Sequence, residues 1–536
     1  MLQRLLPEHG FYPGLMFQEA AARHGRVSVT LDRPLDVAPD AGTDLCYTEL
    51  ADLVDDLAAR LWSAGVRPSE HVAIHKRENA DIVLLACAVS RIGAVPALLS
   101  ASLEESAVAV LLDRLHAPWL ITDGAALGST LSGLDTSLAR GVLTVDEAPG
   151  NTLWLGVYAE VTRRPAIRLH PREPSLITHG SGTTGTPKLA VHCPNTMWNR
   201  LLPQQALGRA TRGEPAALHM SFVHSHLHHL LGVLLHFGSP LLLLLDPDPA
   251  HAGPLLAAHR PGIVETRPHT YVLWEELADA PGGPLSNVRA YGSTFDALHP
   301  RTVRRLLDAS GRRDPRLVQL YGRSETGPIA FGWYTRRGAG RVRGRRVGTG
   351  IPGFTRVRVV DERGRPCPPG ETGAIEARTR GRILTYLGAP EQYARQVDRG
   401  WWRMGDMGYR DRWGALYLLD RETVPPDPEP GRITALDSDL EVEDELLSRM
   451  SELREVIIVQ GRRREPVPVV CTRGDQPLDA GRWRRATGDL PALAEPVQCR
   501  FGDLPRTGTW KIKRLEIARL LAAGELPTLS TAPAHG

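Results

Sequence analysis

Helical and strand-like segments alternate from residue 45 to residue 125, and this alternation constrains the fold more than any other feature. Apolar residues recur with helical spacing in YTELADLVDDLAARLWSAG (47–65) and ADIVLLACAVSRIGA (80–94), whereas HVAIH (71–75) and PWLITD (118–123) are typical of short strands. The pattern continues in PLLLLLD, GIVETRP and RLVQLYG. Because strands that alternate with helices usually pair in parallel, the sequence predicts a layered α/β fold with mostly parallel sheets.

A proline-rich stretch marks the expected division of the chain into two domains. The 536 residues are too many for one hydrophobic core. Four prolines lie within residues 425–430, shortly after the apolar segment LYLLDR. We therefore expect a large N-terminal domain over residues 1–420 and a small α/β domain over residues 421–536.

Charge and cysteine usage exclude several classes of protein. The net charge of +3 gives no general attraction for nucleic acid, and RRGAGRVRGRR (336–346) is interpreted as a solvated loop. The six cysteines are scattered without zinc spacing, as is typical of reduced thiols in the cytoplasm. Polar residues and Pro240 interrupt the apolar segment 230–246, which predicts a helix end, a turn and a buried strand. We expect a cytoplasmic protein with no membrane and no nucleic-acid partner.

A loop rich in glycine and hydroxyl groups lies between two apolar runs in LITHGSGTTGTPKLAVH (176–192). Glycines let successive backbone N–H groups point into one concavity, which binds anionic oxygens when a cation lies beside it. Lys188 supplies that cation, and only four of the 64 Lys and Arg residues are lysine. Such rarity indicates a need for a compact charge. Thr186 and Pro187 precede the lysine, so the loop does not match GxxxxGK[ST], although phosphate binding is still predicted.

Two other motifs have plainer interpretations. GTGIPG (348–353) fits GxGxxG, but Pro352 lies inside it, so we expect a turn into the strand FTRVRVV rather than a dinucleotide site. SFVHSHLHHLLG (221–232) holds four histidines without a nearby carboxylate or cysteine, which argues against a metal centre.

Five motifs in a fixed order resemble those of the adenylate-forming superfamily, which comprises acyl-CoA synthetases, stand-alone adenylation domains and luciferase-like enzymes. They are THGSGTTGTPK, YGRSETG (321–327), GWWRMGD (400–406), LYLLDR (416–421) and LPRTGTWKIKR (504–514). The resemblance implies an active site in the large domain and a mobile small domain. It also implies that a small carboxylic acid reacts with ATP and Mg²⁺ to give acyl-AMP and pyrophosphate, before the acyl group passes to a nucleophile.

The resemblance assigns the nucleotide to residues of both domains. Lys188 and the preceding loop would hold the β- and γ-phosphates, and Glu325 would bind Mg²⁺. Asp406 would accept hydrogen bonds from the ribose hydroxyls, and Arg421 would add a ribose contact. Lys511 would neutralise the α-phosphate and the attacking carboxylate, which repel one another. The other expected nucleotide contacts are Ser181, Gly182, Thr183, Thr184, Gly185, Gly292, Ser293, Thr294, Tyr321, Gly322 and Ser324.

The sequence leaves the acceptor open between a thiol and a nitrogen nucleophile. His224 matches the histidine beside the acyl pocket of acyl- and aryl-CoA ligases, which favours transfer to CoA or to a phosphopantetheine carrier protein. The segment after Arg421 lacks the family's lysine- and glycine-containing hairpin, and Trp510 replaces a glycine beside Lys511. The altered junction favours direct transfer to an amine or another nitrogen nucleophile. A non-catalytic nucleotide-binding homologue and a nucleotidase or kinase are the remaining interpretations.

Overall fold

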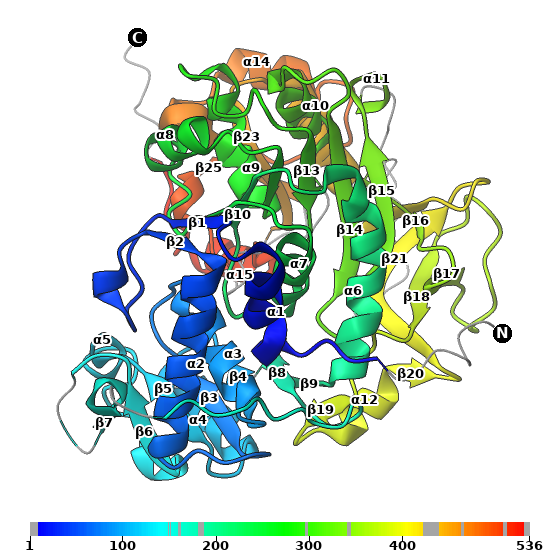
Figure 1. Ribbon diagram of the computed structural model, residues 1–536. Coiled ribbons are helices and arrows are strands. Elements are labelled where there is room, and N and C mark those ends of the chain that lie inside the picture. The colour runs from blue at the N-terminus through cyan, green and yellow to red at the C-terminus, as the bar shows by residue number, and fades with distance from the viewer. Residues whose placement is uncertain are drawn as a thin grey trace.

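The computed structural model describes residues 9–147, 150, 152–158, 162–180, 187–294, 298–339, 345–421, 439–461, 466–506 and 512–529. Three β-sheets organise these residues, with helices between and around them (Figure 1). Two of the sheets are large and belong to the N-terminal part of the chain, and the third is small and belongs to the C-terminal part.

The largest sheet has 14 strands among the described residues. Its order is β17 (Thr355–Val360), β18 (Gly373–Thr379), β21 (Trp401–Arg410), β22 (Leu416–Arg421), β16 (Arg345–Gly350), β15 (Gly327–Tyr334), β14 (Arg316–Arg323), β13 (Ala290–Ser293), β12 (Ile263–Thr266), β10 (Ala216–His219), β11 (Leu241–Leu243), β1 (Ser28–Leu31) and β2 (Asp44–Cys46), with β20 (Val397–Asp398) beside β21.

The second sheet has eight strands, again counted over the described ranges, and the third has three. The second sheet contains β19 (Thr385–Leu387), β9 (Leu189–His192), β8 (Leu176–His179), β4 (Val95–Leu98), β3 (His71–Ile74), β5 (Trp119–Thr122), β6 (Gly141–Thr144) and β7 (Leu153–Trp154). The third contains β23 (Leu453–Gln460), β24 (Pro466–Thr472) and β25 (Val497–Gln498).

The helices follow the chain in numerical order. They are α1 (Met16–His24), α2 (Tyr47–Ser63), α3 (Asp81–Arg91), α4 (Glu105–Arg114), α5 (Gly124–Leu127), α6 (Pro194–Gly208), α7 (Ser225–His236), α8 (Pro249–His259), α9 (Pro268–Trp274), α10 (Pro300–Ala309), α11 (Arg336–Ala339), α12 (Pro390–Arg395), α13 (Asp439–Arg449), α14 (Ala480–Thr487) and α15 (Arg514–Ala523).

The alternating pattern of the first 125 residues is confirmed. α2 and α3 form where helical spacing predicts them, and β3 pairs in parallel with both β4 and β5. α2 begins with a capping box, because the Glu49 carboxylate accepts a hydrogen bond from the backbone N–H of Cys46 at 2.7 Å. β10, β12, β13 and β14 are also parallel. The predicted α/β class is therefore correct.

The expectations for the two ambiguous stretches are confirmed as well. The apolar segment 230–246 comprises the end of α7, a turn at Gly238 with φ +67, and the buried strand β11. GTGIPG forms the end of β16 and a turn into β17. Across the described part of the chain, no helix combines the length and the apolar character needed to cross a membrane.

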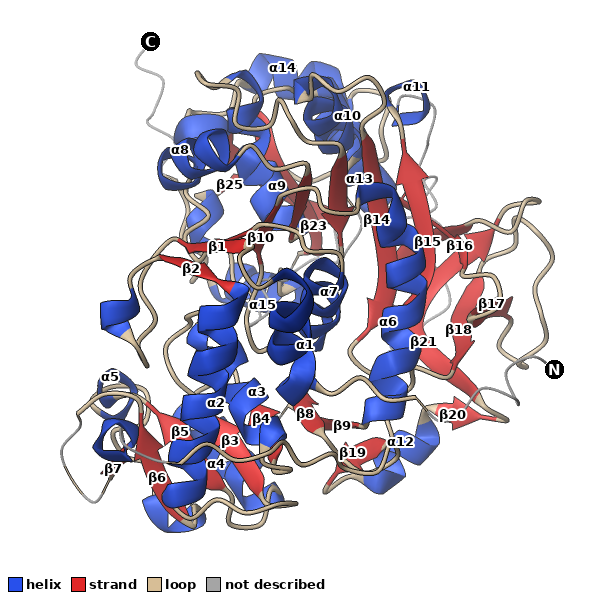
Figure 2. Cartoon of the chain, viewed as in Figure 1, coloured by secondary structure: helices blue, strands red, loops and turns tan. Residues whose placement is uncertain are grey.

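One hydrophobic core joins the two large sheets through helices that pack between them. Val29 on β1 and Leu218 on β10 come from the largest sheet and Ile74 on β3 from the second, and all three belong to the same buried cluster. α1, α2, α3 and α7 add apolar residues to this cluster, and α1 and α7 lie between the sheets in Figure 2. Removal of this surface from water is the main contribution that holds the sheets together.

A buried lysine fixes the start of α3. The Lys76 ammonium lies 2.6 Å from Asp36 and 2.9 Å from Asp81, and neither Lys76 nor Asp81 is exposed to solvent. Burial alone would lower the pKa of Lys76, but the two carboxylates raise it. Loss of either partner would leave a buried charge uncompensated. One of the four lysines therefore has a structural role.

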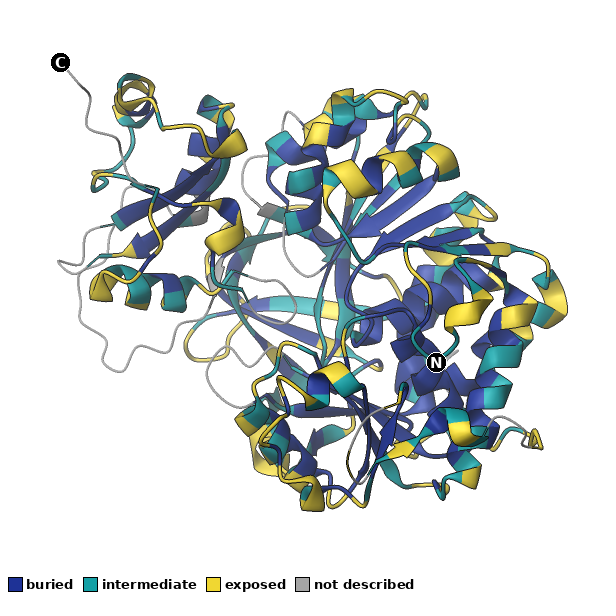
Figure 3. Ribbon diagram, turned by 90° about the vertical axis from the view of Figure 1, so that its left-hand side faces the viewer, coloured by how far each residue is buried: buried dark blue, intermediate teal, exposed yellow. Residues whose placement is uncertain are grey.

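The C-terminal residues form a lobe of their own, seen at the upper left of Figure 3. Side chains of β23 alternate between two clusters: Ile458 packs with α13 and α14, while Ile457 packs with α15. Val272 on α9 joins the second cluster, so the small domain docks on a helix of the large one. The boundary at residues 420–421 stays a prediction, since residues 422–438 lie outside the described ranges.

Candidate active site

A β-hairpin holds the two ends of the glycine-rich loop together. β8 and β9 pair antiparallel, and the Gly180 N–H donates to the Lys188 carbonyl at 2.9 Å. The expected phosphate-binding residues Ser181, Gly182, Thr183, Thr184 and Gly185 lie outside the described residues. The Lys188 side chain is half-buried, and its ammonium lies 5.1 Å from the centroid of the Tyr386 ring. This cation–π contact aims the charge toward β19.

The same tyrosine links Lys188 to Glu325. The Tyr386 hydroxyl donates to Glu325 Oε1 at 2.7 Å, and burial together with the Glu325 charge raises the pKa of Tyr386. A Cβ atom built on Gly180 would lie 3.9 Å from Glu325 Oε1, so this carboxylate faces the start of the loop. The structure thus brings Lys188 and Glu325 together, although 137 positions separate them in the sequence.

Arg200 on α6, which the sequence did not single out, supports the Glu325 turn. Its guanidinium donates to the carbonyls of Gly381 at 2.6 Å and Ser324 at 3.0 Å. Burial lowers the pKa of Arg200 to about 10, so the group stays charged at neutral pH. The expected nucleotide contact Ser324 therefore uses its carbonyl to fix the turn that presents Glu325.

Asp406 and Tyr321, both expected at the nucleotide, lie in contact. The Tyr321 hydroxyl donates to Asp406 Oδ2 at 2.7 Å, and Arg323 Nη2 lies 3.4 Å from Asp406 Oδ1. Burial alone would lower the pKa of Arg323, but the charges of Asp406 and Glu325 raise it. Arg421 pairs with Asp406 in the register of β21 and β22, although its side chain is outside the described part. Arg323 lies within YGRSETG next to Gly322 and was missed by sequence reasoning.

The expected adenine segment ends strand β13. Ser293 and Thr294 are buried, and their hydroxyls have no hydrogen-bond partner among the described residues. Unpaired buried hydroxyls are uncommon and are consistent with a position reserved for a ligand. Gly292 packs against Glu265 of β12, because a Cβ atom on Gly292 would come within 2.6 Å of Glu265 Oε2.

The histidine-rich segment has mixed roles. His224 is half-buried at the N-cap of α7, where its backbone N–H donates to the Ser221 carbonyl at 3.2 Å. His226 Nε2 lies 2.6 Å from Glu265 Oε1. His228 is fully buried, and its burial lowers the pKa to about 4. The described residues contain no group of three or more His, Cys, Asp or Glu side chains that could hold a metal ion.

Lys511 lies outside the described residues, but the structure describes the residues on either side of the segment 507–511 that contains it. Arg506 and Ile512 form an antiparallel bridge around residues 507–511. The Arg506 guanidinium donates to the Phe501 carbonyl at 2.7 Å, and the Phe501 ring stacks on His269 of α9 with centroids 4.4 Å apart. Arg506, at the start of this segment, is therefore anchored through Phe501 beside α9, which follows β12 directly.

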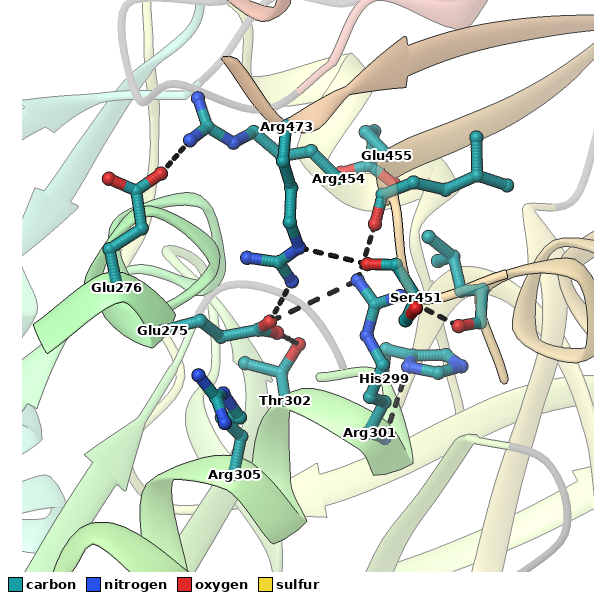
Figure 4. Close-up of polar contacts among 12 residues, drawn as sticks. Glu275, Glu276, His299, Arg301, Thr302, Arg305, Ser451, Arg454, Glu455 and Arg473 are labelled. Atoms are coloured by element: carbon teal, nitrogen blue, oxygen red, sulfur yellow. Dashed lines mark hydrogen bonds and ion pairs between the residues drawn. The ribbon is translucent and has the colours of Figure 1, made fainter. Parts of the chain in front are cut away.

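A polar cluster joins the small domain to the large one (Figure 4). Glu275 is fully buried, accepts a hydrogen bond from Thr302 at 2.5 Å, and pairs with Arg473 of the small domain. Glu276, the next residue, pairs with Arg454 of β23. Because one partner of each pair belongs to each domain, these contacts exist only when the domains are docked.

Arg301 on α10 completes this interdomain cluster. Its guanidinium donates to the carbonyls of Leu447 at 2.7 Å, Met450 at 3.2 Å and Leu453 at 2.7 Å. These carbonyls lie at the end of α13 and just beyond it, where a helix leaves acceptors unsatisfied and favours a positive charge. Arg301 of the large domain therefore caps a helix of the small domain.

Comparison with known proteins identifies the family. The chain matches the model for AMP-binding enzymes over residues 17–387, which is more than half of its length. The chain belongs to this family of adenylate-forming enzymes, whose members use ATP. The identification agrees with the order of the five sequence motifs.

Three similar proteins illustrate the range of the family. The chain is 52% identical over 545 residues to 3-amino-2-hydroxy-4-methoxybenzoate diazotase of Streptomyces cremeus, which covers 97% of each chain. It is 26% identical over 439 residues to 3-aminoavenalumate diazotase of a Streptomyces species, covering 79% of this chain and 75% of the relative. It also resembles the crystal structure of the anthranilate CoA ligase AuaEII in complex with anthranoyl-AMP, with a TM-score of 0.80, 19% identity, and coverage of 98% of this chain and 100% of that chain.

Proposed function

We propose that this protein is an ATP-dependent diazotase that acts on an aromatic amine of the aminobenzoate class. The supporting observation is the 52% identity to a diazotase over 97% of both chains. A diazo group contains two nitrogen atoms, and the amine supplies only one of them. The second must come from an electrophile at the oxidation level of nitrous acid. Nitrite fits this requirement, because it is an oxyanion that an adenylate-forming site can activate in place of a carboxylate.

The proposed reaction has two half-reactions that balance. A nitrite oxygen attacks the α-phosphorus of ATP, and the bond between this phosphorus and the oxygen that bridges to the β-phosphate breaks. Pyrophosphate is released, and nitrosyl-AMP remains. The amine nitrogen then attacks the nitroso nitrogen, the N–O bond to AMP breaks, and AMP leaves as one amine proton is released. The N-nitrosoamine rearranges, takes up a proton and loses water, which gives the diazonium group.

The site residues divide these tasks between the two domains. Lys188 and the glycine-rich loop hold the β- and γ-phosphates, and Asp406 accepts hydrogen bonds from the ribose. Lys511 neutralises the α-phosphate as nitrite approaches, because two anions must be brought together. Glu325 offers a carboxylate oxygen, the ligand type that Mg²⁺ prefers. When bound, Mg²⁺ supplies positive charge that stabilises the departing pyrophosphate.

Acyl transfer is the second candidate. Here a carboxylic acid replaces nitrite, and acyl-AMP passes its acyl group to CoA, to a carrier protein or to an amine. The similarity in fold to an anthranilate CoA ligase favours this reaction, as does the position of His224 at the start of α7. The altered segment after residue 421 argues against the thiol acceptors.

A product assay separates the two candidates. The protein is incubated with ATP, Mg²⁺, nitrite and 3-amino-2-hydroxy-4-methoxybenzoate or 3-amino-2-hydroxybenzoate, with each component omitted in turn. We expect a diazo product and turnover of ATP to AMP only when nitrite and amine are both present, whereas nitrite alone supports the reversible formation of nitrosyl-AMP and pyrophosphate. AMP formation that requires the aromatic acid and CoA but not nitrite, with a thioester as product, contradicts the proposal.

A further inference from the structure

A carboxylate and an imidazole form a close pair inside the large domain. Glu265 lies on the buried strand β12, and its Oε1 is 2.6 Å from Nε2 of His226 on α7. Only 7% of the Glu265 side chain and 10% of the His226 side chain are exposed. Ile263, two residues earlier on the same face of β12, belongs to the hydrophobic core. Glu265 therefore places a charged group where the pattern of the strand calls for an apolar one.

The pair lies between two segments already assigned to the active site. Glu265 is opposite Gly292 in the register of β12 and β13, and its Oε2 occupies the space that a Cβ atom at position 292 would need. Gly292 begins the expected adenine segment. His226 lies in the first turn of α7, two residues after His224, the residue expected beside the substrate. Ligands of open α/β sheets bind at the carboxyl ends of parallel strands, and β10, β12 and β13 are parallel.

The chemistry of the pair suits an amine better than a plain acid. Its carboxylate accepts hydrogen bonds from N–H groups, and a histidine–carboxylate pair can take up one proton and release it again. A pocket for an aliphatic acid would need apolar lining at this position instead.

We propose that Glu265 and His226 bind the amino group of the aromatic acceptor and transfer its proton. This inference rests on the proposed function. As the amine nitrogen bonds to the nitroso nitrogen of nitrosyl-AMP, AMP departs with the electrons of the N–O bond, and the pair accepts the amine proton. The remaining N–H proton of the N-nitrosoamine shifts to its oxygen, and the pair returns the first proton to the same oxygen. The N–O bond then breaks, and water leaves the diazonium group.

The variants Glu265→Gln and His226→Asn test this assignment. Two rates are measured for each: nitrite-dependent exchange of radiolabelled pyrophosphate into ATP without amine, and consumption of 3-amino-2-hydroxy-4-methoxybenzoate with ATP and nitrite. We expect pyrophosphate exchange within about twofold of the wild type, whereas amine consumption falls about 10²–10⁴-fold, as is typical when a general acid–base group is lost. Thermal melting shows whether each variant folds, and Gln at position 265 keeps the shape of the side chain.

The matched control is Glu214→Gln. Glu214 is also a carboxylate that contacts this sheet, but it precedes β10 and pairs with Arg289 and Arg312. Both rates should stay near the wild-type values in this variant. The assignment is overturned if both test variants consume the amine at the wild-type rate. It is also overturned if the rates of pyrophosphate exchange and amine consumption fall equally. Absence of nitrite-dependent exchange in the wild-type protein overturns the proposed function itself, and this inference with it.

Discussion

Replacement of Arg301 by alanine should loosen the small domain from the large one. Arg301 caps α13 by donating to three carbonyls across the domain interface. It also lies 3.9 Å from Glu275, which is completely buried and keeps Arg473 as its other partner. The three hydrogen bonds are lost when the domains separate, whereas the contact between Arg301 and Glu275 lies within the large domain and remains. Only the hydrogen bonds therefore contribute to docking.

The magnitude follows from these contacts. A hydrogen bond to a charged group contributes about 1.5–3 kcal/mol net of water. The three bonds share one guanidinium and are not additive, and Arg473 still neutralises Glu275. We therefore take about 3 kcal/mol as the loss, the upper end of the range for one hydrogen bond to a charged group. This raises the ratio of undocked to docked molecules about 100-fold, since 1.4 kcal/mol corresponds to a factor of ten.

Hydrogen–deuterium exchange of the Arg301→Ala protein measures this loss. Peptides that cover α13 and β23 should exchange faster than in the wild type, whereas peptides from β3 and β4 should not change. Pyrophosphate exchange should also slow, because the proposed mechanism requires Lys511 of the small domain to reach the nucleotide.

Arg305→Ala is the matched control. Arg305 lies on the same helix, but it pairs with Asp279 at the surface of the large domain, where an ion pair contributes little. Its exchange pattern should match that of the wild type. If Arg301→Ala gave the same pattern as Arg305→Ala in α13 and β23, the cluster would not hold the domains together and the reasoning would be wrong.

Three further predictions concern the site and its surroundings. Tyr386→Phe removes the donor to Glu325 and should weaken Mg²⁺ binding about 10–100-fold, measured as the Mg²⁺ concentration at half-maximal pyrophosphate exchange; an unchanged value contradicts the link. Asp406→Asn should raise the KM for ATP about tenfold or more with a smaller change in kcat, whereas a loss confined to kcat would oppose a ribose contact. Burial lowers the pKa of His228 from 6.5 to about 4. As the pH decreases, the unfolded chain therefore protonates this histidine before the folded protein does. The free energy of unfolding then falls between pH 6.5 and pH 4 by up to about 3 kcal/mol. His228→Leu should flatten that decrease in thermal melts between pH 7 and pH 4, and an unaltered pH dependence would rule this contribution out.

The sequence predicted those parts of the molecule whose signal is local. Helical spacing located α2 and α3, and the apolar runs located β3 and β5, because amphipathic periodicity is visible within a single segment. The rarity of lysine pointed to a special role for Lys188, and that role stays a prediction. It did not separate a catalytic need from a structural one, since Lys76 neutralises Asp36 and Asp81 in the core.

Contacts between distant segments could not be read from the sequence. Tyr386 reaches Glu325 only because β19 adds to the edge of β9, and no residue near Glu325 indicates this pairing. Glu265 gave one signal, a carboxylate within an apolar strand, but its partner lies 39 positions away on another element. The docking of Arg301 on α13 depends on how two domains meet, which local patterns do not encode.

Labelled nitrite tests the central claim most directly. If a nitrite oxygen attacks the α-phosphorus, that oxygen stays on phosphorus when the amine later takes the nitroso group. Turnover of oxygen-18-labelled nitrite with ATP and 3-amino-2-hydroxy-4-methoxybenzoate should therefore give AMP with one labelled oxygen, as measured by mass spectrometry. Unlabelled AMP from labelled nitrite, with label appearing in AMP only when the carboxylate of the aromatic substrate is labelled, would contradict the account.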